Sequence, residues 1–282
     1  MNTTVVTATT ATTATTAANT GITDRARFRD LVAAEWIKIR GQRSPCFLAA
    51  FCVLWDAFAA WYSAGHVSIP PGAASFFNPL IYPFNGTAWS LLAVLAATFG
   101  VLSVAGEYSS GLIRSTFVAV PARGRVVAAK ALVVAVCAGC VGLACSAAAL
   151  PVAGSQLAGQ LTGLGPTGPG VPKAVVASAL LLMISSLIGM AISALVRHPA
   201  GAVTASWSAL LFVPQLLGSG SINLPTAAEG MPVQLWTAIS HTQPPSPRPA
   251  PLAPAPVAWP LFAAWPMIAV AVTVWVVRRR DV

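Results

Sequence analysis

Residues 174–196 read AVVASALLLMISSLIGMAISALV, and no charged side chain interrupts them. Within hydrocarbon, each backbone donor and acceptor must be satisfied inside its own segment, so a crossing takes a helix of roughly 20 apolar residues. This run of 23 residues is long enough for one crossing. Arg197-His198-Pro199 follow directly, and the proline predicts that the helix stops there and the chain turns back.

Further apolar runs of similar length lie at about residues 46–64, 86–105, 127–150, 200–217 and 257–277. The 282 residues are 56% hydrophobic and 8% charged, whereas soluble domains average about 45–50% and 25%. Long unbroken runs also disfavour a membrane β-barrel, whose strands alternate apolar and polar residues. We therefore predict an all-α integral membrane protein with six transmembrane helices.

The sequence before the first run has two parts. Residues 1–24 are rich in Thr and Ala without an apolar core, which predicts a disordered cytoplasmic tail, and residues 25–282 form the membrane domain. Over residues 27–43, apolar side chains recur every three or four positions, which predicts an amphipathic helix lying in the membrane interface. The residues of this interfacial helix that face apolar or anionic lipid are Phe28, Leu31, Trp36, Ile39 and Arg40.

The distribution of positive charge sets the predicted orientation. The formal net charge is +9, but the cations lie at the ends of apolar runs, which favours contact with lipid head groups over nucleic-acid binding. With the N-terminus inside, fourteen of the sixteen Lys and Arg residues fall on the inner side, and Lys173 and Arg248 fall outside. The positive-inside rule thus predicts a multi-pass protein of the cell membrane with both termini in the cytoplasm.

The inner loop 106–126, between the second and third runs, is the segment most indicative of function. A short helix beginning near Gly111 and ending at Pro121 would present Phe117 on an apolar face and Arg114 beside it. Such a helix suits docking into a groove of a partner protein. A plainer alternative remains open, in which the charges of the loop serve only topology and contact with lipid head groups.

The order acidic residue, Gly, Arg, Pro, Arg, Lys across this loop resembles the permease subunits of type-2 ABC exporters. The resemblance extends loosely over residues 27–282 and covers the surface helix, the six runs, the long second inner loop and an element before the last run. Leu112 stands where that family usually has Thr. The positions that match are Glu107, Gly111, Pro121, Lys130 and either Arg123 or Arg125.

The resemblance implies that the loop is a coupling helix that contacts a separate ATPase subunit. It further implies an exporter permease that forms the substrate path, pairs with a second permease (a copy of itself or a related chain) and lies among membrane lipids. The chain contains no GxxxxGK[S/T] phosphate-binding loop. ATP and Mg²⁺ are therefore expected on the partner, and we expect this chain to be no enzyme and to bind no cofactor and no nucleic acid.

Two other function classes remain open: a proton-coupled secondary transporter that uses Asp56, and a non-transporting membrane assembly protein. Asp56 is the one acid well inside a predicted span, where a charge is costly unless it is paired or protonated. Cys137 and Cys140 have CxxC spacing but an Ala/Val/Gly context, which favours packing over metal binding. We expect no metal site, because the histidines fall in three different loops.

Overall fold

The computed structural model describes residues 27–67, 78–109, 111, 122–158, 168, 170–218, 225–240 and 255–279. Every regular element within these residues is a helix. Among these residues, six helical stretches are long and apolar enough to cross a membrane, and each contains one predicted span. They are Ser44–Gly65, Gly86–Tyr108, Arg123–Gln156, Val171–Val196, Pro199–Leu217 and Pro256–Arg279.

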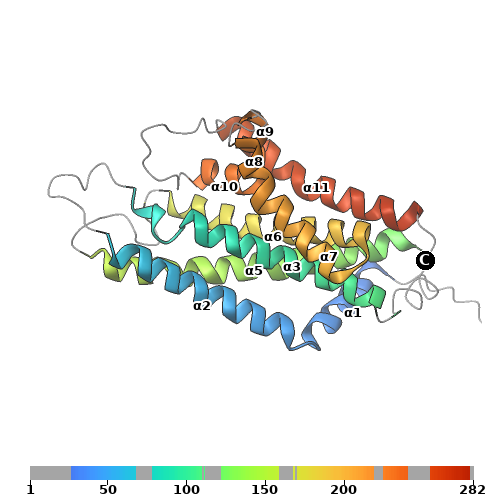
Figure 1. Cartoon of the computed structure of the whole chain (residues 1–282). Helices are drawn as coiled ribbons and strands as arrows, with labels where there is room; N and C mark the ends of the chain where they lie inside the picture. The colour runs from blue at the N-terminus through green and yellow to red at the C-terminus, as the bar shows by residue number, and fades with distance from the viewer. Residues whose placement is uncertain are drawn as a thin grey trace, which may run out of the picture.

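Figure 1 shows the long helices lying side by side along a common direction, with α1 set at an angle to α2 near one end of the bundle. The helix bounds, in chain order, are α1 Phe28–Arg40, α2 Ser44–Gly65, η2 Pro79–Ile81, α3 Gly86–Ser109, α5 Arg123–Gln156, α6 Val171–Val196, α7 Pro199–Trp207, η3 Ser208–Phe212, α8 Val213–Gly218, α9 Pro225–Glu229, α10 Pro232–Ser240 and α11 Ala255–Arg279.

Helix α6 is the centre of the bundle and packs against α3, α5, α7, α10 and α11. Its closest approach is to α3, where two glycines replace side chains. A Cβ at Gly189 would lie 2.0 Å from the carbonyl oxygen of Ala97, and a Cβ at Gly100 would lie 1.8 Å from that of Ser186. Small residues let helix backbones approach closely inside membranes, so this pair of glycines sets the α3–α6 spacing.

The predicted turn after α6 is confirmed. Helix α6 ends at Val196, Arg197 takes a left-handed conformation with φ 60°, and α7 begins at Pro199. The fifth span is continuous but contains a π-helical segment, η3, between α7 and α8. Helix α5 is longer than predicted, with 34 residues that extend beyond the apolar run 127–150 at both ends.

The short helix α10 lies in the segment before the last span. A short interfacial helix around Leu235 and Trp236 is predicted there from its apolar residues. A helix does form, but both side chains are fully buried inside the bundle. The indole nitrogen of Trp236 donates a 2.9 Å hydrogen bond to the hydroxyl of Ser178 in α6, and its ring stacks on Trp89 at a centroid distance of 5.6 Å.

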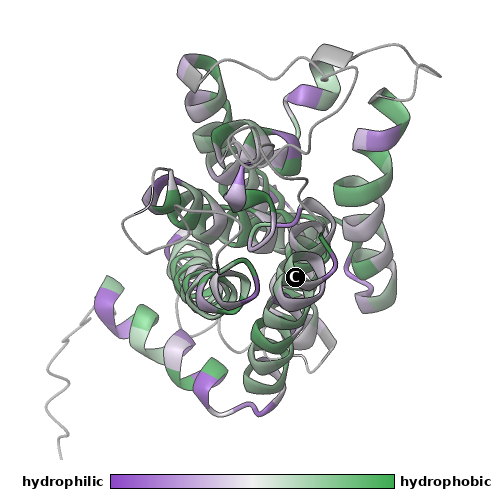
Figure 2. Cartoon of the chain, turned by 90° about the vertical axis from the view of Figure 1, so that its left-hand side faces the viewer, coloured by the Kyte–Doolittle hydropathy of each residue, from purple (hydrophilic) through white to green (hydrophobic). Residues whose placement is uncertain are grey.

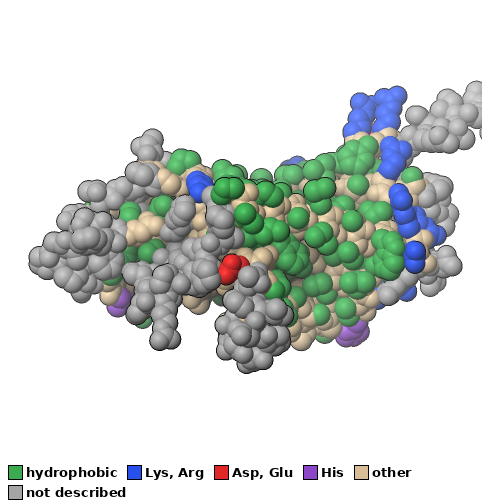
Figure 3. All heavy atoms as spheres, turned by 90° about the horizontal axis from the view of Figure 1, so that it is seen from above, with side chains coloured by type: hydrophobic (Ala, Val, Ile, Leu, Met, Phe, Trp, Pro, Cys, Tyr) green, Lys and Arg blue, Asp and Glu red, His purple; other side chains and the backbone are tan. Residues whose placement is uncertain are grey.

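The outer surface of the bundle is apolar in the middle and carries positively charged side chains at one end. Large apolar side chains such as Phe47, Leu54 and Met267 are exposed on α2 and α11, and Figure 2 shows hydrophobic residues along the long helices. On the face drawn in Figure 3, apolar side chains cover the middle, and Lys and Arg side chains gather at the right-hand end. This is the surface pattern of a protein whose middle lies in hydrocarbon.

Candidate functional site

Four charged side chains from three helices meet at one end of the bundle and form an alternating ring. We call Glu35, Lys38, Glu107 and Lys130 the ion-pair cluster. The amine of Lys38 lies 2.7 Å from Glu35 Oε1 and 2.8 Å from Glu107 Oε1. The amine of Lys130 lies 2.9 Å from Glu107 Oε1 and also pairs with Glu35 Oε2. Each amine therefore bridges both carboxylates, and the four formal charges cancel.

The local sequence explains why these side chains meet. Lys130 lies in an apolar stretch of α5, so its amine needs an acidic partner when the helix packs. Helix α1 supplies that partner by packing on α5, with Leu31 against Val126 and Ala129. One turn after Leu31, Glu35 faces the same side of α1 and is only 4% exposed. Burial of the cluster is thus a consequence of the α1–α5 contact.

The two carboxylates of the ion-pair cluster favour the charged form of Lys38. Burial by itself tends to lower the pKa of Lys38, but the hydrogen bonds to Glu107 and Glu35 and the negative charges of these carboxylates together outweigh burial, so the pKa of Lys38 lies above its ordinary value of 10.5. Buried ion pairs of this kind hold helices in register, because breaking one pair leaves an uncompensated charge in a dry site. The ion-pair cluster therefore ties α1, the end of α3 and the start of α5 together.

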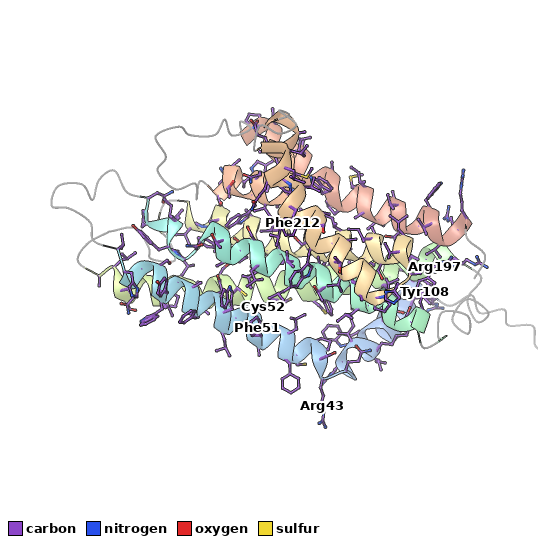
Figure 4. All side chains as sticks on the ribbon, viewed as in Figure 1. Arg43, Phe51, Cys52, Tyr108, Arg197 and Phe212 are labelled. Atoms are coloured by element: carbon purple, nitrogen blue, oxygen red, sulfur yellow. The ribbon has the colours of Figure 1, made fainter. Side chains whose placement is uncertain are left out.

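Two further contacts hold the same end of the bundle. The guanidinium of Arg197, in the turn between α6 and α7, lies over the ring of Tyr108 at 5.5 Å from the ring centroid, and Figure 4 shows the two side chains together. The side chain of Arg278 in α11 lies so close to Gly124 that a Cβ there would be 2.8 Å from the guanidinium. Both flanks of the loop 106–126 are therefore packed against neighbouring helices.

The predicted coupling residues are only partly brought together. Glu107 and Lys130 meet in the ion-pair cluster, whereas Arg123 and Arg125 lie in the first turn of α5 with Arg125 exposed. Gly111 takes a left-handed conformation with φ 71°, a geometry that favours glycine. Arg114, Phe117 and Pro121, together with the short helix predicted between 111 and 121, lie outside the described residues.

Two functional candidates, Glu35 and Lys38, are absent from the sequence-based set. A signal for them exists in the sequence. They are three residues apart on one helix, and Lys130 is a lone cation in an apolar stretch that requires an acid from elsewhere. The residues predicted to face apolar or anionic lipid also divide into two groups. Leu31 packs on α5, whereas Phe28, Trp36 and Arg40 are exposed and Ile39 is half-buried.

Asp56 faces the interior of the bundle, as its position in a predicted span requires. Its residue is 1% exposed, and its Oδ2 atom has no hydrogen-bond partner in the described part of the chain. It lies in α2, a helix that packs on α5. An acid buried inside a membrane-spanning helix is a candidate functional residue.

The cysteines lie on the faces of α2 and α5, and all five are free thiols. Across the residues that the structure describes, no group of three or more His, Cys, Asp or Glu side chains could hold a metal ion.

Comparison with known proteins adds no family: no protein-family model matches the sequence, and no curated protein matches it.

Proposed function

We propose that this chain is the membrane-spanning permease subunit of an ATP-driven export system, coupled through the loop 106–126 to a separate ATPase subunit. The observation that carries the proposal is the ion-pair cluster. It joins Glu107 at the end of α3 and Lys130 near the start of α5 to Glu35 and Lys38 of α1. A push on the loop between α3 and α5 would thus move three helices as one body.

The same proposal includes the orientation of the chain in the membrane and its pairing with a second permease. The end of the bundle with the ion-pair cluster faces the cytoplasm, in agreement with the cations gathered there, and α1 lies in the inner membrane interface. A second permease, either another copy or a related chain, completes the substrate path. Closure of the ATPase subunits would bias a two-state motion of the helices through this end.

Charge reversal at an exposed residue of the coupling region tests the proposal. The tagged protein is purified in mild detergent from its own source membranes, and the eluate is assayed for ATP hydrolysis and for a protein with a phosphate-binding loop. Arg125→Glu should reduce the co-purified ATPase activity at least several-fold, because it reverses a charge within the loop 106–126. Lys173→Glu is the matched control at the opposite end of the bundle and should leave that activity unchanged.

Two results would contradict this proposal. One is wild-type protein that brings down no such ATPase. The other is an Arg125→Glu variant that retains as much ATPase as the Lys173→Glu control, provided that all three proteins elute as the same monodisperse species.

A second candidate, a proton-coupled secondary transporter, is supported by the buried and unpartnered Oδ2 of Asp56. This candidate expects activity in vesicles that contain no ATPase, driven by a proton gradient and lost in Asp56→Asn. The export proposal expects transport to require the ATPase and to survive that substitution.

A further inference from the structure

A cavity of about 360 Å³ lies in the angle between α1 and α2, and α3, α5 and α6 close its other sides. Its lining is apolar except at one place: Arg40 is its only charged residue among those that the structure describes. Cavities lined by apolar side chains stay dry or bind apolar molecules. A cavity of this size beside a membrane-spanning helix is therefore suited to hydrocarbon.

The length of α2 indicates where the cavity lies relative to the membrane. Its 22 residues correspond to roughly 33 Å, close to the hydrocarbon thickness of about 30 Å. Ser44, the first residue of α2, is therefore at the edge of the hydrocarbon. Arg40 precedes that edge and lies at the level of the lipid head groups. Cys52, at the far end of the lining on α2, lies roughly 12 Å inside.

The cavity lining changes from polar to apolar with depth, as a lipid changes from its head group to its acyl chains. At the head-group end are Arg40 and Trp36, an arginine and an aromatic residue of the kind enriched at membrane interfaces. Further in are Leu48, Phe99 and Val141, without a polar group to satisfy. No carboxylate in the described part of the chain forms a salt bridge with Arg40, so its guanidinium is available to an external anion.

We propose that this cavity binds one acyl chain of an anionic phospholipid, whose head group pairs with Arg40. The occupant is a membrane lipid because the cavity begins at head-group level and continues into the hydrocarbon region. The anionic head group follows from the cation at the entrance, which no carboxylate of the described residues pairs with. The proposal does not depend on the transport function, since it requires only that α2 spans the membrane.

Photo-cross-linking tests the site directly. The purified full chain is reconstituted into phosphatidylcholine vesicles with a trace of phosphatidylglycerol or phosphatidylcholine, each with the same diazirine about 10 Å down one acyl chain. Mass spectrometry then locates the cross-links. We expect them within residues 46–52 of α2 and 136–141 of α5, at a yield about fivefold higher for phosphatidylglycerol, the factor that one arginine facing an anionic head group supplies.

Two pairs of variants separate the head-group contact from the chain site. Arg40→Gln should abolish the preference for phosphatidylglycerol and leave the cross-linking by phosphatidylcholine unchanged. Arg43→Gln is the matched control, because Arg43 lies outside the lining and points away from the bundle in Figure 4. Ala49→Phe should fill the cavity and remove cross-links from both lipids, whereas Ala50→Phe, next to it but outside the lining, should not.

Three results would overturn the proposal. They are cross-links that fall outside both segments, equal yields for the two lipids in the wild type, and an Ala49→Phe variant that elutes and melts like the wild type but cross-links as strongly. Exclusion of both lipids by a second copy of the chain, detected as a protein dimer cross-linked through these segments, would overturn it as well.

Discussion

Replacing Lys130 with Met should destabilise the protein far more than the loss of an ordinary surface cation. The amine of Lys130 pairs with two carboxylates, and the side chains of Lys130, Glu35 and Glu107 are 10%, 5% and 12% exposed. Removing one partner from a buried pair costs about 3–5 kcal/mol, because the remaining charge is left uncompensated. Lys38 still pairs with both acids, so we expect the lower end, about 3 kcal/mol.

The matched control is Arg29→Met. Arg29 pairs with Asp30 at 3.6 Å, but their side chains are 74% and 58% exposed, and pairs in water contribute about 0–1 kcal/mol. The assay is the melting temperature of the detergent-solubilised protein followed by tryptophan fluorescence. A loss of 3 kcal/mol corresponds to a decrease of roughly 6–12 °C for a chain of this size, against at most a few degrees for the control.

A double variant separates an uncompensated charge from lost packing. Lys130→Met with Glu35→Gln removes the charge left behind, so the melting temperature should recover part of the loss relative to Lys130→Met alone. If Lys130→Met lowers the melting temperature no more than Arg29→Met does, then water solvates the ion-pair cluster, and it cannot tie the three helices together. The structural basis of the coupling proposal would then be removed.

The remaining predictions concern the α3–α6 seam and the alkaline limit of stability. Gly189→Ala should cost roughly 1–3 kcal/mol of stability by overpacking, because the new Cβ would lie 2.0 Å from a carbonyl oxygen of α3. In the same melting assay Gly154→Ala should cost far less, because a Cβ at Gly154 would meet no neighbouring atom outside its own helix within 4 Å. The raised pKa of Lys38 contributes stability that is fully present below 10.5 and lost as pH rises through the higher folded value. Lys38→Met should therefore remove part of the alkaline decrease in melting temperature, and an unchanged alkaline profile would contradict this.

The spans could be predicted because hydropathy is a local property that each run carries by itself. The extra length of α5 could not be predicted in the same way. A hydropathy pattern reports where hydrocarbon is, whereas the helix continues through Arg123 and Arg125 at one end and past Pro151 at the other. These flanks are helical because they pack against α1, α2 and α11, which is a tertiary effect.

The candidate site also depends on tertiary contacts that a local sequence pattern cannot predict. Glu107 and Lys130 could be singled out as charges at the ends of apolar runs. Glu35 lies 95 positions before Lys130, and no local pattern joins them. For α10, a short apolar segment with a tryptophan suits both an interface and a packed core. The deciding partner is the hydroxyl of Ser178, one of several serines in the uncharged run of α6.

The length of α5 places the ion-pair cluster relative to the membrane. Its 34 residues extend roughly 51 Å, which exceeds a hydrocarbon thickness of about 30 Å by some 20 Å. Helix α2, packed against it, is only long enough to cross. Helix α5 therefore extends beyond the hydrocarbon at one or both of its ends, and Lys130 lies seven residues from one of those ends. Lys130 is 8% exposed and pairs with Glu35 of α1, so α1 is the element that shields this amine from water.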